Sequence, residues 1–317
     1  KPLLIKRFYL KETEKKIKEL LRDKAIDLVI VETLQVAEYI RGIPNIFKVL
    51  DEHNLEFIRA GRRIKASDNW IKKIYYYIIM RRLRNYEIRV IRDFNHCLVC
   101  SDTDKKTIKK FIRSKEVSVI PNSVDTSYFY PAEKGDFSKK IIFTGTMWYE
   151  PNIDAAKYFA GEILPLLLSE EPGIEFIIVG ECPSKDILAL SKQKNISVTG
   201  YVKDIRPYLS EAAVFVAPVR MGSGTRLKIL VAMSMGIPVV STTIGCEGLA
   251  IINGENICIA DSPNQFCKAI TRLIQDKLYR NHIAWSGRRL VENQYSHEVV
   301  QMKLNLFWKN IESCIKN

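Results

Sequence analysis

The sequence lacks any long apolar run. No stretch approaches the roughly 18 uncharged apolar residues of a membrane-spanning helix, and the most hydrophobic short runs, 28–31 and 212–217, have only the length of a strand. A secretory signal is also missing, because the N-terminal residues become charged at once. These absences argue against a membrane-spanning chain and predict a cytoplasmic protein.

The sequence also lacks the cysteine pattern of a disulfide framework. Its 7 cysteines are an odd number, which is typical of reduced thiols in a cytoplasmic protein. Cys97 and Cys100 form a C-x-x-C inside an apolar strand pattern, but no second cysteine pair lies nearby. A structural zinc site needs a full tetrahedral ligand set, so we favour packed strand thiols and expect no metal.

Acidic residues are too few to balance the basic ones. The formal net charge is +13, and residues 1–138 contribute most of it, with 29 Lys and Arg against 19 Asp and Glu. A basic field of this kind attracts nucleic acid, anionic lipid or phosphorylated substrates alike. Because no recognised nucleic-acid-binding motif accompanies it, we do not expect nucleic acid as a partner.

Short β-branched apolar runs alternate with helical patterns, as they do in doubly wound parallel sheets. The strand-like runs are 26–32, 46–51, 96–101 and 117–122, then 140–145, 174–180, 196–201, 213–218, 237–242 and 256–260. A polar stretch with Pro and Gly over 126–138 separates the two sets and predicts a linker. We therefore predict an α/β chain of two Rossmann-like doubly wound domains, over 1–125 and 139–290. A C-terminal helix over 291–317 is expected to pack back toward the first domain.

Ligands of such sheets bind at the carboxyl ends of the strands, which places the expected site in the cleft between the domains. One glycine-punctuated loop lies at such an end. Gly222 and Gly224 let the backbone turn tightly before a helix that begins near Thr225. A helix N-terminus favours a phosphate, and Arg226 and Lys228 add full positive charges. The alternative is an ordinary strand–helix turn, since neither the complete dinucleotide-binding pattern nor the P-loop pattern is present.

Around this loop the sequence closely resembles a known enzyme family. From 213 to 249, with the loop sequence Gly-Ser-Gly-Thr-Arg-Leu-Lys, it resembles the donor-binding segment of family 4 nucleotide-sugar glycosyltransferases. The segments 49–57, 120–131, 141–165 and 198–218 resemble other parts of that family in the expected order, with Ser123 in place of a usual glycine. The resemblance implies a retaining enzyme of the GT-B architecture, in which an acceptor-side domain and a donor-binding domain face a cleft.

The resemblance also implies roles for single residues. The positions that it assigns to the donor are Gly200, Tyr201 and Val202 for the base, Gly145 and Thr146 for the diphosphate, Gly222, Ser223, Gly224, Thr225, Arg226 and Lys228 for the phosphates, and Val231 for the ribose. Enzymes of this family need no metal, because fixed donors neutralise the leaving diphosphate. The resemblance thus implies a nucleotide-sugar donor, no cofactor and no metal.

His53 is the catalytic candidate. It follows the apolar strand pattern 47–50, and in the resembled family a histidine at this place contacts the transferred sugar and helps to position it. The alternative is a loop histidine that merely hydrogen-bonds Asp51 or Glu52.

Two departures from the family pattern bear on activity. Many members have a glutamate where this chain has Ser223 and Val231, and the second glutamate typically binds the ribose hydroxyls. Valine accepts no hydrogen bond, which predicts a loss of about 1–3 kcal/mol in nucleotide binding. The family's first strands and glycine-rich acceptor loop should also precede the strand pattern 26–32, so we expect an incomplete first domain.

The basic stretch 70–92 predicts a long helix with two interpretations. It interleaves Trp70, Ile74 and Tyr77 with lysines and arginines. Basic, aromatic amphipathic helices lie on anionic membranes, and in that case the acceptor is lipid-linked. The alternative is an ordinary core-packed helix with a solvated basic face.

These inferences lead to one main hypothesis. The chain is a retaining glycosyltransferase of the hexosyltransferase type, which moves a sugar from a nucleotide-diphosphate donor to a glycan or lipid-linked acceptor in bacterial polysaccharide or glycolipid assembly. It is expected in the cytoplasm, with a peripheral place at the inner face of the membrane if its basic half binds anionic lipid. Two alternatives stay open: a catalytically impaired binding subunit, motivated by Val231, and a nucleotide-sugar epimerase of the same architecture.

Overall fold

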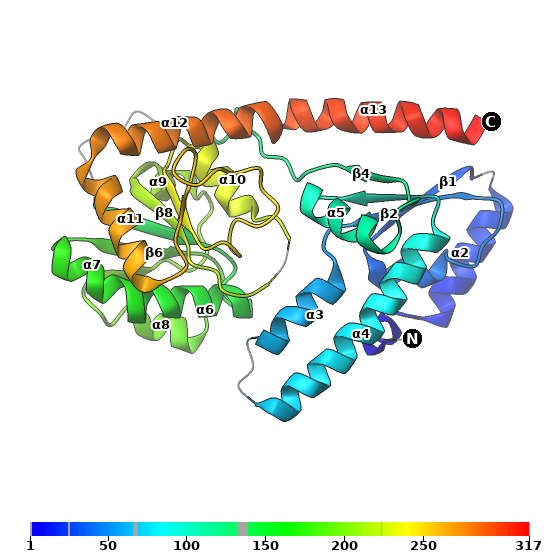
Figure 1. Cartoon of the computed structure of the whole chain (residues 1–317), viewed down its shortest axis with the longest axis horizontal. Helices are drawn as coiled ribbons and strands as arrows, with labels where there is room; N and C mark the ends of the chain where they lie inside the picture. Colours follow the sequence, from blue (N-terminus) through cyan, green and yellow to red (C-terminus); the bar gives the residue numbers. More distant parts are fainter. Residues whose placement is uncertain (1, 25, 66–68, 132–138, 223, 317) are drawn as a thin grey trace. The chain divides into compact units, whose positions relative to one another are not determined.

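The protein consists of two compact α/β units (Figure 1). The computed structural model describes residues 2–24, 26–65, 69–131, 139–222 and 224–316. The first unit comprises Lys1–Pro121 and Gln301–Asn317, and the second comprises Asn122–Val300. All ladders between the described strands are parallel, which confirms the predicted α/β class.

The first unit is built on a four-stranded sheet in the order β1-β2-β3-β4. Its strands are β1 (Leu28–Glu32), β2 (Phe47–Glu52), β3 (His96–Val99) and β4 (Val117–Val119). Its helices are α1 (Leu3–Arg7), α2 (Lys11–Asp23), the 3-10 helix η1 (Leu34–Tyr39), α3 (Glu56–Lys65), α4 (Trp70–Asp93) and α5 (Asp102–Phe111). Ser101 accepts a hydrogen bond from the Asp104 N–H at 3.1 Å and so caps the N-terminus of α5.

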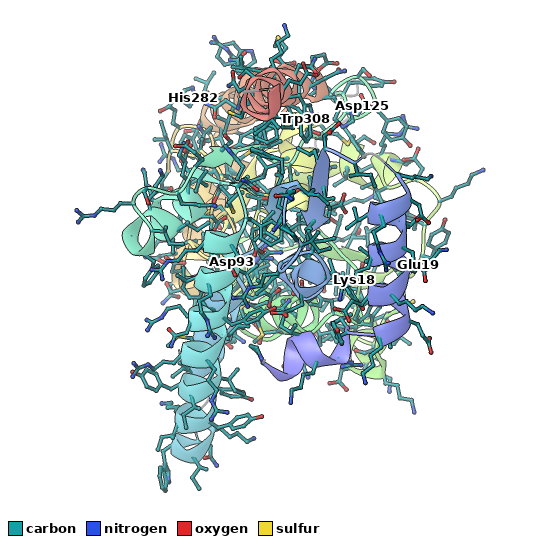
Figure 2. The ribbon with its side chains drawn as sticks, turned by 90° about the vertical axis from the view of Figure 1, so that its right-hand side faces the viewer. Lys18, Glu19, Asp93, Asp125, His282 and Trp308 are labelled. Carbon is teal, nitrogen blue, oxygen red and sulfur yellow. The ribbon has the colours of Figure 1, made fainter. Side chains whose placement is uncertain are left out.

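Both faces of this sheet are covered by apolar side chains. Successive side chains of a strand point to opposite faces, so Leu50 lies in the larger core of the unit, while its neighbour Val49 lies in a second cluster. That second cluster contains Phe307 and Ile311 of α13 (His297–Lys316), and Trp308, labelled in Figure 2, borders it. The last helix of the chain therefore completes the first unit.

Helix α4 is buried in its second half and exposed in its first. Six residues between Leu83 and Ile91 are buried. Trp70, Ile74 and Tyr77 are exposed by 69%, 52% and 48%, and Figure 2 shows side chains projecting on both sides of this part of the helix. The core-packed interpretation of this stretch therefore holds only for its second half. No helix in the described part of the chain is both long and apolar enough to cross a membrane.

The second unit is built on a six-stranded sheet in the order β10-β9-β8-β5-β6-β7. Its strands are β5 (Lys140–Thr144), β6 (Glu175–Val179), β7 (Ile196–Val198), β8 (Ala212–Ala217), β9 (Val239–Ser241) and β10 (Cys258–Ile259). Its helices are α6 (Glu150–Tyr158), the π-helix η2 (Phe159–Ile163), α7 (Leu164–Glu170), α8 (Lys185–Leu190), α9 (Arg206–Ser210), α10 (Leu227–Ser234), α11 (Pro263–Gln275) and α12 (Lys277–Gln294). In Figure 1, α6, α7 and α8 lie on one side of this sheet, and α10 and α12 lie on the other.

The strand order of the second unit fixes where a ligand can bind. The chain runs from β5 outward to β6 and β7 on one side, then returns to β8 and continues to β9 and β10 on the other. The order therefore reverses between β5 and β8, which are hydrogen-bonded neighbours. Open α/β sheets bind ligands outside the carboxyl ends of the strands at such a switch point.

The segment that follows Asn122 is held on the second unit by Arg288 of α12. The Arg288 guanidinium donates to the carbonyl oxygens of Phe129 at 2.8 Å and Thr126 at 3.2 Å. Ser234 at the end of α10 donates to the same Phe129 oxygen at 2.6 Å. Residues 132–138 of the predicted linker lie outside the described residues.

A buried carboxyl group joins α4 to α3 in the first unit. Glu87 is fully buried and accepts hydrogen bonds from the N–H groups of Glu56 and Phe57 at 2.8 and 3.0 Å, where α3 begins. Burial raises the pKa of Glu87 to about 8, because the carboxylate loses its hydration. The two N–H groups act in the opposite direction, and the charges of Glu56 and Asp104 raise the pKa further.

We expect the α3–α4 contact to weaken as the pH rises. In the unfolded chain the pKa of a glutamate is about 4.3. Between that pH and about 8, opening of the α3–α4 contact therefore releases the Glu87 proton, and the free energy of opening falls as the pH rises. Hydrogen exchange of the first α3 amides, corrected for the intrinsic pH effect, should show a smaller protection at pH 8 than at pH 5.5. Glu87→Gln should reduce this pH dependence, and Glu12→Gln on the exposed side of α2 should leave it unchanged. The same pH dependence in Glu87→Gln and wild type would refute the assignment to Glu87.

Candidate functional site

The loops that follow β5 and β8 emerge at the same edge of the second sheet. β5 ends at Thr144 and is followed by Gly145 and Thr146, while β8 ends at Ala217 and is followed by the loop that leads to Arg226. Because the two strands are parallel neighbours, their carboxyl ends lie side by side. The structure thus brings these predicted site residues to the switch point.

Two glycines let the backbone pack closely at this edge. A Cβ atom at Gly180, just after β6, would lie 1.7 Å from the carbonyl oxygen of Gly145. A Cβ atom at Gly145 would lie 2.7 Å from Asn152 Nδ2 and 2.8 Å from Lys228 Nζ. All three distances are shorter than real contacts of a Cβ atom. The contact at Gly180 is with backbone, so that position requires glycine, whereas a side chain at Gly145 would displace the ends of the Asn152 and Lys228 side chains.

The loop before α10 has the strained backbone that its glycines predict. Gly222 and Gly224 have φ angles of 103° and 85°, which residues with a side chain rarely adopt. Arg226 folds back over the loop and donates from Nη2 to the Met221 carbonyl at 3.3 Å. Helix α10 begins at Leu227, with Arg226 as its N-cap residue, two residues later than predicted. Ser223 lies outside the described residues.

The Thr225 side chain of this loop is held by the segment at the start of the second unit. Asn122 donates from Nδ2 to the Thr225 hydroxyl at 2.6 Å. The two residues are 103 positions apart in the sequence. The segment 120–131, which resembles the family's linker motif, therefore takes part in shaping the loop.

Lys228 brings a positive charge to the switch point. Its ammonium donates to Asn152 Oδ1 at 2.8 Å and lies 4.3 Å from the centre of the Phe143 ring. Burial, and to a lesser degree the charge of Arg226, lower the pKa of Lys228 to about 7. Within the described residues, no carboxylate forms an ion pair with this ammonium. An anion that binds here would supply the missing counter-charge.

Asn152 is the main site residue that the sequence interpretation missed. It is 8% exposed. Besides accepting from Lys228, it donates from Nδ2 to the Thr146 carbonyl at 3.0 Å, so it links the loop after β5 to α10. The only sequence signal is an asparagine directly after Pro151, in the first turn of the helix.

Helix α6 also reaches the loop after β8. One turn beyond Pro151, Asp154 accepts two hydrogen bonds from Arg220, at 2.7 and 3.1 Å. The Arg220 guanidinium also stacks 4.1 Å from the centre of the Tyr158 ring. Helix α6 therefore fixes both loops of the switch point.

The predicted base-binding residues lie at the same edge, beyond β6. Gly200 follows β7 with a φ angle of 70°, Tyr201 is 74% exposed, and Val202 packs against the apolar cluster under α10. No hydrogen bond joins these three residues to the described part of the glycine loop. Val231, the predicted ribose position, packs against the same apolar cluster as Val202.

His53 lies in the first unit, directly after β2. It is half exposed, and its Nε2 atom lies 3.5 Å from Asp51 Oδ2. Asp51 is one of the two partners expected if His53 is only a loop histidine. The catalytic role of His53 stays a prediction.

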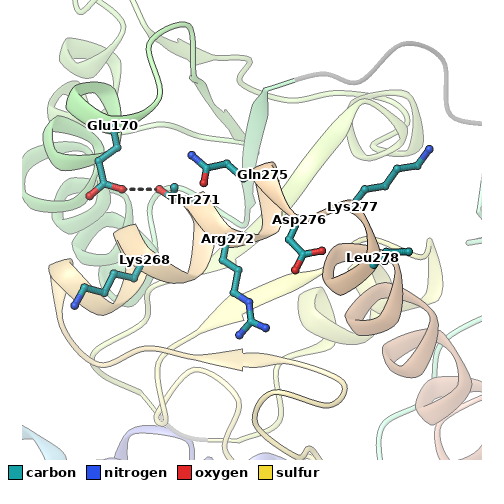
Figure 3. Close-up of a pocket in the computed structure, with 8 residues that line it drawn as sticks. All are labelled: Glu170, Lys268, Thr271, Arg272, Gln275, Asp276, Lys277 and Leu278. Atoms are coloured by element: carbon teal, nitrogen blue, oxygen red, sulfur yellow. Dashed lines mark hydrogen bonds between the residues drawn. The ribbon is translucent and has the colours of Figure 1, made fainter.

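A separate pocket of about 590 Å³ lies on the helices of the second unit (Figure 3). Its lining residues are Glu170, Lys268, Thr271, Arg272, Gln275, Asp276, Lys277 and Leu278. Thr271 donates to Glu170 at 3.0 Å across it. Because it mixes both charge signs and contains no strand end, it is a weaker candidate for an anionic ligand.

Nothing described here has the composition of a metal centre. Among the described residues, no group of three or more His, Cys, Asp or Glu side chains could hold a metal ion. Cys97 and Cys100 are both buried. The interpretation of this pair as packed strand thiols fits their position in and after β3.

Comparison with known proteins connects the second unit to one family. Residues 138–276 match the family model described as "Glycosyl transferases group 1". The chain is 22% identical over 302 residues to a Klebsiella pneumoniae protein described as an "Uncharacterized 44.6 kDa protein in cps region", covering 91% of this chain and 76% of that protein. It is 30% identical over 208 residues to the Escherichia coli UDP-Gal:alpha-D-GlcNAc-diphosphoundecaprenol alpha-1,3-galactosyltransferase, covering 57% of this chain and 52% of that enzyme.

Solved structures extend the similarity to the whole described fold. TarM of Staphylococcus aureus matches with a TM-score of 0.70 at 18% identity, over 92% of this chain and 57% of TarM. HepE of Anabaena, solved in complex with UDP, matches with a TM-score of 0.72 at 14% identity, over 95% of this chain and 82% of HepE. The chain has the GT-B fold, and residues 138–276 are similar to group 1 glycosyltransferases. The chain spans about half the length of the E. coli enzyme and of TarM.

Removal of the Asn152 side chain should loosen the switch point. Asn152→Ala leaves the Lys228 ammonium without its hydrogen-bond partner and the Thr146 carbonyl with only the Tyr149 N–H as a donor, which should destabilise the second unit by about 1–3 kcal/mol. The measurement is urea unfolding, monitored by the hydrogen-exchange protection of the α6 and α10 amides. Asn264→Ala in the exposed first turn of α11 is the control and should change stability by less than about 0.5 kcal/mol. Equal effects of the two substitutions would show that Asn152 is not a structural link.

Proposed function

We propose that the chain is a glycosyltransferase that transfers a sugar from a nucleotide-diphosphate donor to a hydroxyl acceptor. The observation that carries the proposal is the Lys228 ammonium, which lies at the switch point beside the glycine loop and pairs with no described carboxylate. The family match over 138–276 includes every strand and loop of this edge. The loops at this edge and the similarity thus support the same conclusion.

The chemistry requires an acceptor for negative charge. When the bond between the sugar anomeric carbon and the phosphate oxygen breaks, the electron pair stays on the diphosphate, and the acceptor hydroxyl forms the new bond and releases its proton. Arg226 and Lys228 would neutralise the leaving diphosphate, together with the loop N–H groups before α10. We therefore propose a reaction that needs neither a metal nor a cofactor.

The donor is proposed to lie along the edge of the sheet, with its diphosphate at the switch point and its base near Gly200–Val202. Val231 cannot bind a ribose hydroxyl, and its packing on the apolar cluster leaves that hydroxyl to another group or to water. The missing hydrogen bond predicts an affinity roughly one to two decades below that of a site with glutamate.

The reaction is proposed to retain the configuration of the sugar, with His53 of the first unit as the residue that positions the sugar.

The names of the similar proteins suggest which substrates to test first. The E. coli relative is named for a UDP-Gal donor and a diphosphoundecaprenol-linked acceptor, and HepE was solved with UDP. We therefore propose a UDP-sugar as donor and a glycan or lipid-linked acceptor, in bacterial polysaccharide assembly. The proposed place of the reaction is the cytoplasm, at the inner face of the membrane where the acceptor is lipid-linked.

A nucleotide panel tests this proposal. UDP, GDP and ADP are compared by thermal shift and calorimetry, and at least one of them should protect the second unit. Arg226→Ala removes a charge-assisted hydrogen bond and should weaken that nucleotide by at least about tenfold, which corresponds to roughly 1.4 kcal/mol.

Lys268→Ala is the matched control, because it removes one cation from the pocket of Figure 3 and none from the switch point. It should leave nucleotide binding unchanged. No protection by any of the three nucleotides, or a loss of binding only in Lys268→Ala, would overturn the assignment.

The pKa of Lys228 predicts that nucleotide binding depends on pH. With a pKa of about 7, half of the free protein lacks the Lys228 proton at that pH, whereas a bound diphosphate stabilises the charged form and raises the pKa. Binding should therefore take up a proton above pH 7, and the affinity should fall as the pH rises from 7 to 9. Calorimetry in buffers of different ionisation enthalpy measures the uptake. Lys228→Met should abolish the uptake, and uptake that persists in this variant would exclude Lys228 as its source.

A further inference from the structure

A pocket between α1 and α4 of the first unit has a cationic rim. Its volume is about 860 Å³, and α4 contributes Arg82 and Arg89 while α1 contributes Lys6 and Arg7. None of the described residues that line it is acidic. In the described part of the chain, none of these four side chains forms an ion pair with a carboxylate, so their charges are available to an anion.

The floor of this pocket is apolar. Ile79 and Leu83 line it together with the rings of Tyr75 and Tyr86. Along α4, the lining residues Tyr75, Ile79, Arg82, Tyr86 and Arg89 follow one another at alternating steps of four and three, so they occupy one face of the helix. One helix face therefore combines hydrocarbon and cationic groups.

A second face of α4 lies next to the pocket face. Trp70, Ile74 and Tyr77 follow the same spacing, and each is about half exposed or more. Figure 2 shows side chains projecting outward from this first half of α4. Exposed tryptophan and tyrosine rings beside cationic side chains are typical of surfaces that lie at the boundary between a bilayer and water. Tyr75 on the pocket face is itself 55% exposed.

We propose that this pocket binds a lipid that carries a phosphate group. The phosphate contacts the rim formed by Arg82, Arg89, Lys6 and Arg7, and the first part of the hydrocarbon chain lies on Ile79 and Leu83. The exposed aromatic face of α4 then rests on the surface of the bilayer that supplies the lipid. Arginine suits this role because its guanidinium can donate two parallel hydrogen bonds to one phosphate.

Size and composition favour a lipid phosphate over a free phosphate ion. Pockets that hold drug-sized ligands measure roughly 300–1,000 Å³, and this one falls in that range, which is far more than a single phosphate fills. A free phosphate would also leave the apolar floor uncovered. The inference does not depend on the nucleotide site, because every lining residue belongs to the first unit.

The test compares three probes with the full chain. Dioctanoyl phosphatidate provides a phosphate on hydrocarbon chains, dioctanoyl phosphatidylcholine has similar chains with a neutral head group, and inorganic phosphate has no chain. Binding is followed by calorimetry below the concentration at which the lipids form micelles. We expect dioctanoyl phosphatidate to bind most tightly, by at least about tenfold over either of the other probes, because only this probe satisfies rim and floor together.

Two double variants show whether the pocket is responsible. Arg82→Ala with Arg89→Ala should weaken the binding of dioctanoyl phosphatidate by on the order of thirtyfold, given about fivefold for each cation near an anionic lipid surface. Lys15→Ala with Lys16→Ala removes the same charge from exposed positions of α2 and should change the affinity by less than about twofold. Helix content and UDP binding measured on both variants confirm that they are folded.

Three results would overturn the proposal. Equal affinities for dioctanoyl phosphatidate and inorganic phosphate would identify a simple anion site. Equal affinities for the two lipids would identify unspecific apolar binding. Equal losses in the two double variants would show that net charge attracts the lipid and that the pocket does not. Failure of UDP binding in wild-type protein would contradict the proposed function and leave the lipid result unaffected.

Discussion

The pairing of β5 with β8 is the constraint on which the second unit depends. Hydrogen bonds between these two parallel strands place two loops at one edge, although the loops are about 75 residues apart in the sequence. Because the strand order reverses at this pair, the crossover connections leave toward opposite sides and the edge between the two strands stays open. Asn152 and Asp154 of α6 then fix the two loops to each other. The arrangement of the two loops is thus a consequence of strand order, and the side chains refine it.

The two units use positive charge in different ways. In the second unit, Lys228 is enclosed and burial lowers the pKa of its ammonium group, so its charge depends on what binds beside it. In the first unit, Arg82 and Arg89 stay in contact with water and keep their charge under all ordinary conditions. Enclosed charge favours a ligand of defined shape, whereas exposed charge favours attraction over a distance.

The sequence predicts the strands better than the site. Every strand overlaps a predicted β-branched run, although Phe47–Glu52 and Ala212–Ala217 each extend one residue beyond it. Ile196–Val198 ends three residues before the predicted run does, because Gly200 adopts a left-handed turn there. The glycine loop was found from local spacing alone, since tight turns are encoded by neighbouring residues. Asn152 was not found, because its role depends on Lys228, 76 positions away. The division of α4 into a buried and an exposed half could not be predicted either, since the same apolar spacing is compatible with both environments.

The contact between Gly145 and Gly180 has a consequence for how this sequence can change over time. A methyl group at 180 would meet the Gly145 carbonyl oxygen at 1.7 Å, and no rotation of a side chain can relieve a collision with backbone. Position 180 is therefore closed to gradual change, because even an alanine there would force β6 away from the loop that follows β5. At Gly145 a substitution would instead displace the side chains of Asn152 and Lys228, so its consequence would be a disturbed switch point and not a separation of backbone.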